Sequence, residues 1–183
     1  MPVAVAKLTW DDIKDRLENH LELVNGELVV SPVAGWIHQR ICRLLGSLIL
    51  PFVEAWKLGE FFPLPIHVVF GPGVEYEPDC CLIGAPAAMD ETEQCYRGVP
   101  DLIIEVISES NRSHDTVVKF RDYERFGVKE YWLVDAREAH VRVFHLDADG
   151  KYQALGVFTP GEAVGTRILA GLALDPATLF AKR

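Results

Sequence analysis

Apolar and polar positions follow two rhythms along the chain, one typical of helices and the other of strands. An acidic turn after Thr9 predicts a short helix that this threonine caps and that reaches about Glu18. Two short apolar runs, at 21–24 and 27–30, flank an Asn-Gly pair, which favours a tight β-hairpin turn. A helix followed by a hairpin is therefore expected before residue 31.

The longest helical pattern covers residues 36–56. Apolar side chains recur there at the spacing of the core-facing side of an α-helix: Ile41, Leu44, Leu45, Leu48, Ile49, Phe52 and Val53. Pro51 is expected to bend or end this helix, because proline has no N–H group and its ring clashes with the preceding turn. A long helix that packs on the core is predicted.

A strand, a helix and a second strand are predicted in the middle of the chain. Residues 101–107 are apolar except at the first position and at Glu105, a pattern typical of a strand covered on both faces. A helix capped by residues 111–113 is expected to end at Gly127, before a strand at 129–135. Further strands are expected at 60–62, 66–70, 77–83, 140–145 and 151–158, and a short helix near 176–181.

Length and composition fit one domain with its own core. The chain has 183 residues, 49% of them hydrophobic, so a single α/β domain over residues 1–183 is expected to fold without disulfides or a structural metal. The 27 Asp and Glu outnumber the 18 Lys and Arg, and this net charge of -9 argues against DNA binding through bulk positive charge. Residues 75–93 hold acids but no Lys or Arg, whereas 112–129 hold a basic excess. Any contact with nucleic acid should therefore be local.

Cysteine usage and hydropathy indicate the compartment. The four cysteines have no C-x-x-C spacing and include the neighbouring pair Cys80 and Cys81 in an apolar run, so buried, reduced thiols are expected. No uncharged apolar stretch approaches the roughly 20 residues that span a membrane, and the N-terminus lacks the basic start and apolar core of a signal peptide. A soluble, cytoplasmic protein without a membrane partner is expected.

Asp79 and Glu105 are the acids whose positions suggest chemistry. Each belongs to an apolar run, and two neighbouring strands would bring their carboxylates together. A buried carboxylate must be protonated, ion-paired or bound to a metal. Two carboxylates with carbonyls and waters make an oxygen site suited to Mg²⁺ or Mn²⁺. The alternative is a strand-end aspartate and a glutamate paired with a core Arg or Lys.

Lys119 bears on this choice because it follows the Glu105 strand on the next predicted helix. Asp115, Lys119 and Tyr123 are four residues apart and form one stripe on that helix. A stripe that faces the end of the sheet would bring the ammonium group to the two carboxylates. A stripe that faces solvent would hold only a weak pair between Asp115 and Lys119. The sequence alone leaves both possibilities open.

A set of motifs spreads from about residue 8 to residue 145: residues 22–29, Ser31-Pro32, His38, Pro78-Asp79, residues 100–108, Asp115, Lys119, Tyr123, Gly127-Val128 and residues 130–135. Together they resemble the Uma family of putative restriction endonucleases, within the PD-(D/E)XK nuclease superfamily. The resemblance implies a restriction-endonuclease-like α+β fold, in which helices flank a mixed central sheet. The chain pattern adds a β-hairpin near each end.

The resemblance also implies roles for single residues. Asp79, Glu105 and the carbonyl of Val106 would bind a divalent cation, Mg²⁺ or Mn²⁺, and Lys119 would orient or activate the attacking water. The common superfamily pattern has lysine two residues after the glutamate, where this chain has Ile107. Lys119 would be the relocated counterpart of that lysine.

Two further candidates each have an ordinary alternative. Glu27 lies where the family places an early metal-site acid, which favours a role in the site, and the alternative is a polar hairpin residue on the solvent face. His38, on the long helix, is either a proton carrier or a satisfied, partly buried histidine. The calcium-loop-like opening at 147–150 lacks the later ligands of such a loop, so a hairpin turn is expected there.

Two functions agree with these observations. The first is a magnesium-dependent endonuclease that hydrolyses phosphodiester bonds in nucleic acid, with DNA favoured over RNA, and that works as a homodimer because two single-site subunits can then cut both strands. The second is a nuclease-fold protein without catalysis that acts as a binding or regulatory module. The chain has no glycine-rich phosphate loop, zinc-ligand spacing or G-x-S-x-G elbow, which excludes nucleotide-dependent and serine-hydrolase chemistry.

Overall fold

The computed structural model describes residues 7–14, 21–30, 34–86, 94–108 and 112–181. One set of strands comprises β3 (Gly59–Phe62), β6 (Cys80–Gly84), β8 (Leu102–Ile107), β9 (Glu130–Asp135), β10 (His140–Leu146) and β11 (Tyr152–Phe158). A second set comprises β1 (Leu21–Val24), β2 (Glu27–Val30), β4 (His67–Gly71), β5 (Val74–Tyr76) and β7 (Cys95–Arg97). The helices are α1 (Trp10–Ile13), α2 (Trp36–Trp56), the π-helical segment η2 (His114–Lys119), α3 (Phe120–Phe126) and α4 (Ala177–Phe180).

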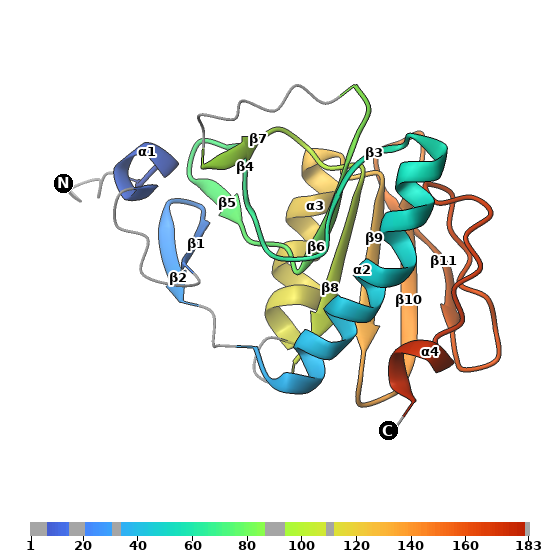
Figure 1. Cartoon of the computed structure of the whole chain (residues 1–183). Coiled ribbons are helices and arrows are strands. Elements are labelled where there is room, and N and C mark those ends of the chain that lie inside the picture. The colour runs from blue at the N-terminus through green and yellow to red at the C-terminus, as the bar shows by residue number, and fades with distance from the viewer. Residues whose placement is uncertain (1–6, 15–20, 31–33, 87–93, 109–111, 182–183) are drawn as a thin grey trace.

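The strands form two mixed sheets with helices against them (Figure 1). The larger sheet has the order β11-β10-β9-β8-β6-β3, and the smaller has the order β2-β1-β5-β4-β7. β8 runs parallel to β9, and β4 runs parallel to β7, while the other pairs are antiparallel. The α+β fold with mixed sheets is confirmed. Within the described residues, no helix has the length and apolar character that crossing a membrane requires.

Helices cover both faces of the larger sheet, and β8 lies between them. α2 packs on one face and α3 on the other (Figure 1). Alternate residues of β8 divide between these layers: Leu102, Ile104 and Val106 pack under α2, and Ile103 and Ile107 pack beside α3. Since side chains alternate along a strand, Glu105 points to the α3 side. The predicted strand covered on both faces is thus confirmed, and its one acid has a defined direction.

The strand expected at 77–83 is confirmed from Cys80 on, but its predicted start is three residues too early. β5 ends at Tyr76 in the smaller sheet, and β6 begins at Cys80 in the larger one. Pro78 lies between them, and proline cannot donate a ladder hydrogen bond, which favours a break there. The chain crosses between the sheets at this point, so Asp79 lies at the first turn into β6.

The long helix forms over the predicted residues, 36–56, and it does not end at Pro51. Pro51 is exposed, so water can satisfy the carbonyl that loses its partner. Buried Ile49 and Val53 hold the helix to the core on both sides of the proline. Packing therefore outweighs the local cost of one missing hydrogen bond.

Other boundaries follow the expected turn chemistry. The hairpin of β1 and β2 has the predicted register, with Val24 opposite Glu27. Gly127 ends α3 at φ 90°, a backbone conformation that glycine tolerates best. The 147–150 segment is the predicted turn between β10 and β11. The described part of the first helix ends at Ile13, and its predicted extension lies outside the described residues, as does residue 111 of the second predicted cap.

Candidate active site

Glu105 is a fully enclosed acid with two donors on one oxygen. It lies in the middle of β8 with 2% of its surface exposed. The Lys119 ammonium lies 3.0 Å from Glu105 Oε1, and the Tyr123 hydroxyl donates to the same oxygen at 2.9 Å. The stripe expected on the helix after β8 therefore faces this carboxylate and not the solvent. An exposed Asp115–Lys119 pair is excluded.

Asp79 lies beside Glu105 because β6 and β8 are antiparallel neighbours. Their register pairs Cys80 with Ile104, so Asp79 falls opposite the next residue of β8. The Val106 amide donates to Asp79 Oδ2 at 2.7 Å, and the Asp79 amide lies 3.5 Å from Glu105 Oε2. The N–H and C=O of a strand residue point to the same side, so the Val106 carbonyl also faces the Asp79 side. The structure thus brings three of the predicted metal-site groups together.

Lys119 is a buried cation among acids. It is 4% exposed, and its Nζ lies 2.8 Å from Glu22, 3.0 Å from Glu105 and 3.8 Å from Asp115. Burial acts to lower the pKa of Lys119, but the surrounding carboxylates reverse this and raise that pKa above its usual value. Lys119 ends η2, and π-helical turns often occur at functional sites. The ammonium therefore stays charged at neutral pH.

Glu22 is the early acid that reaches this cluster, and the sequence analysis did not identify it. It is 2% exposed in β1, where it pairs with Lys119 and with His114 Nε2 at 2.9 Å. Burial acts to raise the pKa of Glu22, but Lys119 and His114 outweigh burial and lower that pKa to about 2. The candidate named from this hairpin, Glu27, is exposed at the turn. The described contacts therefore join Glu22, and not Glu27, to Lys119.

One sequence signal was available for Glu22. Like Glu105, it is an acid flanked by apolar residues in a strand, with Leu21 before it and Leu23 after it. Such an acid demands a partner wherever the strand is covered on both sides. The reasoning that identified Glu105 thus makes Glu22 a candidate, but it does not rank Glu22 above Glu27 until the cover of the hairpin is known.

His38 reaches Asp79 from the first turns of α2. His38 Nε2 lies 2.8 Å from Asp79 Oδ2, and the Cys42 sulfur lies 3.6 Å from His38 Nδ1. Burial acts to lower the pKa of His38, yet the bonds to Asp79 and Cys42 raise that pKa to about 10. His38 is thus a charged partner of Asp79 in this structure. Ligand atoms of His38, Cys42 and Asp79 also lie within 4.8 Å of one another, close enough to share an ion.

The cluster contains more acid than base, which is the condition that favours a divalent cation. Its four carboxylates belong to Glu22, Asp79, Glu105 and Asp115. Burial raises the pKa of Glu105 well above its usual range in spite of Lys119, and burial raises the pKa of Asp115 to about 6. Carboxylate and carbonyl oxygens are the ligands that Mg²⁺ prefers. The residues therefore fit such an ion at Asp79 and Glu105.

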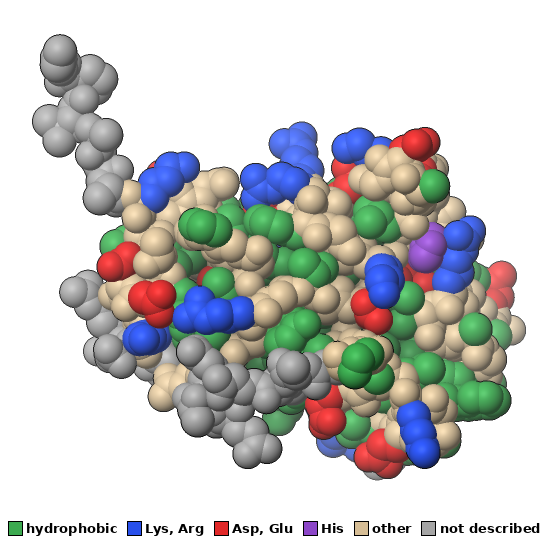
Figure 2. Space-filling view, turned by 90° about the horizontal axis from the view of Figure 1, so that it is seen from above, with side chains coloured by type: hydrophobic (Ala, Val, Ile, Leu, Met, Phe, Trp, Pro, Cys, Tyr) green, Lys and Arg blue, Asp and Glu red, His purple; other side chains and the backbone are tan. Residues whose placement is uncertain are grey.

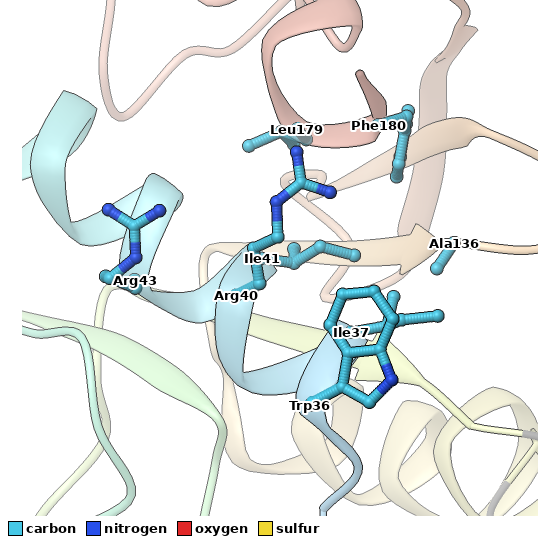
Figure 3. A pocket seen from close by; sticks show the side chains of 8 residues that line it. All are labelled: Trp36, Ile37, Arg40, Ile41, Arg43, Ala136, Leu179 and Phe180. Atoms are coloured by element: carbon cyan, nitrogen blue, oxygen red, sulfur yellow. The ribbon is translucent and has the colours of Figure 1, made fainter. Parts of the chain in front are cut away.

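A cavity of about 670 Å³ lies at the start of α2 (Figure 3). It is lined by Trp36, Ile37, Arg40, Ile41, Arg43, Ala136, Leu179 and Phe180. Trp36 is 75% exposed, and the Arg40 guanidinium donates to the Ala181 carbonyl next to α4. Ala136 follows the carboxyl end of β9, which is parallel to β8. The cavity thus lies at the sheet end that also carries the acid cluster.

Basic side chains elsewhere are dispersed. Figure 2 shows the face at the top of Figure 1, away from the start of α2, and there Lys and Arg lie interspersed with Asp and Glu. Such a surface has no single-sign field of the kind that draws nucleic acid in. This agrees with the acidic net charge of -9. Contacts with phosphate are therefore expected only where a few basic groups gather.

Comparisons with known proteins agree with the fold and with the motifs. The model of the family described as "Uma2: Putative restriction endonuclease" matches residues 8–177. Among solved structures, a putative nuclease belonging to DUF820 from Anabaena variabilis is 21% identical, with a TM-score of 0.79 over 94% of this chain and 97% of that chain. At this identity, the structural similarity establishes the fold. No functionally curated protein matches the sequence.

Proposed function

The chain belongs to the Uma2 family of putative restriction endonucleases, and from this membership we propose that it is a metal-dependent nuclease that hydrolyses phosphodiester bonds. The observation that carries the proposal is the arrangement of Asp79, Glu105 and Lys119. Asp79, the residue before β6, lies opposite Glu105 of the neighbouring strand β8, and Glu105 contacts a buried ammonium group that stays charged. A divalent cation bound there would neutralise charge on the scissile phosphate and lower the pKa of the attacking water.

The side chains around the proposed metal site have different roles in the reaction. Asp79 and Glu105 would hold the cation, and the Val106 carbonyl, whose N–H bonds to Asp79, would offer a third oxygen. Lys119 Nζ stabilises the negative charge that develops on the phosphate or orients the water, because it is the cation nearest to Glu105. Glu22 also pairs with Lys119, at 2.8 Å. A positioned, desolvated ammonium is worth far more than one in water.

His38 has a separate task in this scheme. It donates to Asp79 and is charged when Asp79 has no other cation. We assign it the role of a proton carrier beside the metal-binding acid. Its other ring nitrogen faces Cys42, which fixes the orientation of the ring.

Nucleic acid is the substrate class, with DNA ahead of RNA because the family description names restriction endonucleases. The start of α2 supplies a local binding surface. Arg40 and Arg43 can contact phosphates, and the exposed Trp36 ring can stack on a base. These side chains share the start of α2 with His38, and they supply a local group of positive charges on an acidic chain. We place the protein in the cytoplasm, where buried thiols such as Cys42 stay reduced.

A cleavage assay tests the proposal. The purified full chain is incubated with single- and double-stranded DNA and RNA, with Mg²⁺, with Mn²⁺ or with a chelator. Cleavage is expected with either metal and not with the chelator. Asp79→Asn and Glu105→Gln should each abolish it, because each removes a metal-binding charge at nearly constant volume. Glu27→Gln is the matched control and should cleave as the parent does, since Glu27 is exposed.

One observation favours the alternative of a nuclease fold that binds without cleaving. The acids already have protein partners: Asp79 contacts His38, and Glu105 contacts Lys119 and Tyr123. A network satisfied in this way can be purely structural. Nucleic-acid binding that survives in Asp79→Asn, together with no cleavage by the parent under any metal, would support that alternative.

A further inference from the structure

A second group of metal-binding side chains lies in the smaller sheet. His67 is the first residue of β4, Glu75 is in the middle of β5, and Glu77 follows β5. Their ligand atoms all lie within 4.8 Å of one another. His67 Nδ1 is 2.8 Å from Glu75 Oε1 and 3.4 Å from Glu77 Oε1. Three groups that can bind one ion thus converge on one face of two neighbouring strands.

The register explains why these side chains meet. β4 and β5 are antiparallel, and Val69 pairs with Glu75. Residues two apart along a strand share a face, so His67 and Glu77 lie on the same face as that pair. Tyr76 points to the opposite face, toward α3. The convergence of His67 and Glu75 therefore follows from the register of β4 and β5, and Glu77 continues the same alternation one residue beyond β5.

The buried Glu75 carboxylate is an independent observation that points to a bound ion at this group. It is 0% exposed, and among the described residues its Oε2 atom has no hydrogen-bond partner. A buried carboxylate oxygen without a partner costs free energy that folding rarely tolerates. Burial and the nearby acids also raise the pKa of Glu75 in spite of His67. The unpaired oxygen, Oε2, is on the same carboxylate as Oε1, which contacts His67, so an ion bound to both oxygens would satisfy it.

We propose that His67, Glu75 and Glu77 form a second divalent-cation site, which takes a transition metal of the zinc type. One imidazole nitrogen and two carboxylates suit Zn²⁺, with water completing its coordination. Mg²⁺ prefers oxygen ligands only, so it fits Asp79 and Glu105 better than it fits this group. The two sites share no ligand and differ in the metal that they select.

The second site is positioned to support the first. An ion there links β4 to β5, and β5 pairs with β1 through Glu75 and Leu23. The Glu77 amide also lies 3.3 Å from Glu22 Oε1. Glu22 is the residue that holds Lys119. The bound ion thus stiffens the strands that deliver Glu22.

Zinc counting on the full chain tests the site. Zn²⁺ is titrated into the parent, into Glu75→Gln, into His67→Asn and into Asp79→Asn, and stoichiometry and affinity are measured by calorimetry. Glu75→Gln and His67→Asn should each lose one bound ion or weaken it about a hundredfold or more, because even indirect support of a ligand is worth up to that much. Asp79→Asn should keep that ion. Circular dichroism without metal checks that each variant is folded. If one of the two ligand variants, Glu75→Gln or His67→Asn, does not fold, the other still tests the site.

The possible outcomes separate this site from the proposed nuclease centre. If neither ligand variant changes zinc stoichiometry or affinity, the second site does not exist. If Asp79→Asn removes the same ion as Glu75→Gln, there is a single shared site and the proposal fails. A parent that binds this ion but never cleaves nucleic acid leaves the second site standing while the nuclease proposal fails.

The fluorescence of Trp10 offers a test that does not depend on measuring the stoichiometry of bound zinc. Its ring packs 4.7 Å from the His67 ring, centroid to centroid. Co²⁺ bound by His67 should therefore quench Trp10 fluorescence. The quenching should be absent in Trp10→Phe and in His67→Asn. Quenching that is equal in the parent and in both variants would contradict the assignment.

Discussion

Lys119 is the residue on which the acid cluster depends, since one buried ammonium group serves Glu22, Glu105 and Asp115. Removing it leaves at least one buried carboxylate without a cation, which is far more costly than losing an exposed pair. A divalent cation at Asp79 and Glu105 would then become more necessary to the fold. The contributions of Lys119 to stability and to catalysis are therefore separable by adding metal.

Lys119→Met should keep the alkyl stem and delete the charge. We expect unfolding without metal to be easier by about 3 kcal/mol or more, the scale of breaking a buried pair. Cleavage should fall about a hundredfold or more, while metal still stabilises the variant. Lys129→Met is the control, because Lys129 pairs with Asp101 at 2.8 Å but is 59% exposed, and such pairs contribute about 1 kcal/mol at most. Parental cleavage by Lys119→Met would remove Lys119 from the mechanism.

Glu22 predicts a pH dependence of stability. Its pKa in the folded protein is about 2 against an ordinary value of 4.5. A carboxyl group whose pKa is lower in the folded than in the unfolded protein stabilises the folded state at pH values above the unfolded-state pKa. That stabilisation is lost as the pH falls from 4.5 toward 2. The parent should therefore lose about 3 kcal/mol more than Glu22→Gln across this window. Urea unfolding at several pH values measures it, and Glu27→Gln should follow the parent; superimposable curves for all three would refute the assignment.

At the residue level, strand acids were the informative signal. Glu105 could be found from the sequence because it interrupts a long apolar run. Glu22 could not be ranked above Glu27, since both lie in a short hairpin. The ion-pair partner that distinguishes Glu22, Lys119, is 97 positions later in the sequence. Which acid of a hairpin is buried depends on what covers it, and that is a tertiary property.

At the level of elements, Val74 and Tyr76 of β5 join the cluster around α3, and the smaller sheet also has a small apolar cluster on its other face. Trp10, Ile13 and Leu23 form this cluster, whereas the larger sheet packs against α2 and α3 with many more buried residues. Regions with few buried apolar contacts open more readily. The strand that carries Glu22 therefore depends on these three side chains.

Leu23→Ala should loosen the smaller sheet selectively. Leu23 is 0% exposed, and truncating such a leucine costs about 2–5 kcal/mol. Amide hydrogen exchange should speed up in β1 and β2 and stay slow in β8 and β9. Leu28→Ala, in the same hairpin but 43% exposed at that residue, should change little. An equal increase in both sheets would show that they open as one unit.

Elements with local signals could be predicted, and those that depend on tertiary context could not. The Asn-Gly hairpin, the helix at 36–56 and the end at Gly127 each follow from turn chemistry or periodicity. The start of β6 at Cys80, later than expected, was missed because the residues around Pro78 do not show that the chain crosses there between two sheets. The π-helical turn of η2 was missed as well, since its spacing of Asp115 and Lys119 also fits an α-helix. Both deviations lie next to the acid cluster.

At the level of the whole molecule, the acid cluster of one chain, as the proposed nuclease centre, would cut one strand of a duplex at a time. A two-fold homodimer places two such centres on one substrate, which is the economical way to cut both strands. Sedimentation at micromolar concentration should therefore give twice the chain mass of 20.5 kDa. A protein that stays monomeric there, and also on duplex DNA, would contradict the dimer. Nucleic-acid affinity should fall with added salt, because it depends on a few phosphate contacts.

The most direct test of the account is whether Mg²⁺ stabilises the folded protein through Glu105. A ligand that binds only the folded state raises the melting temperature, so thermal unfolding of the parent should shift upward with Mg²⁺. Glu105→Gln should unfold at the same temperature with and without Mg²⁺. Glu75→Gln should keep the Mg²⁺-dependent shift, because Glu75 belongs to the second site and is not a ligand of the Mg²⁺ site. A Mg²⁺ shift that persists in Glu105→Gln, or that is absent from the parent, would show that Asp79, Glu105 and Lys119 form a structural ion-pair network and not a metal centre.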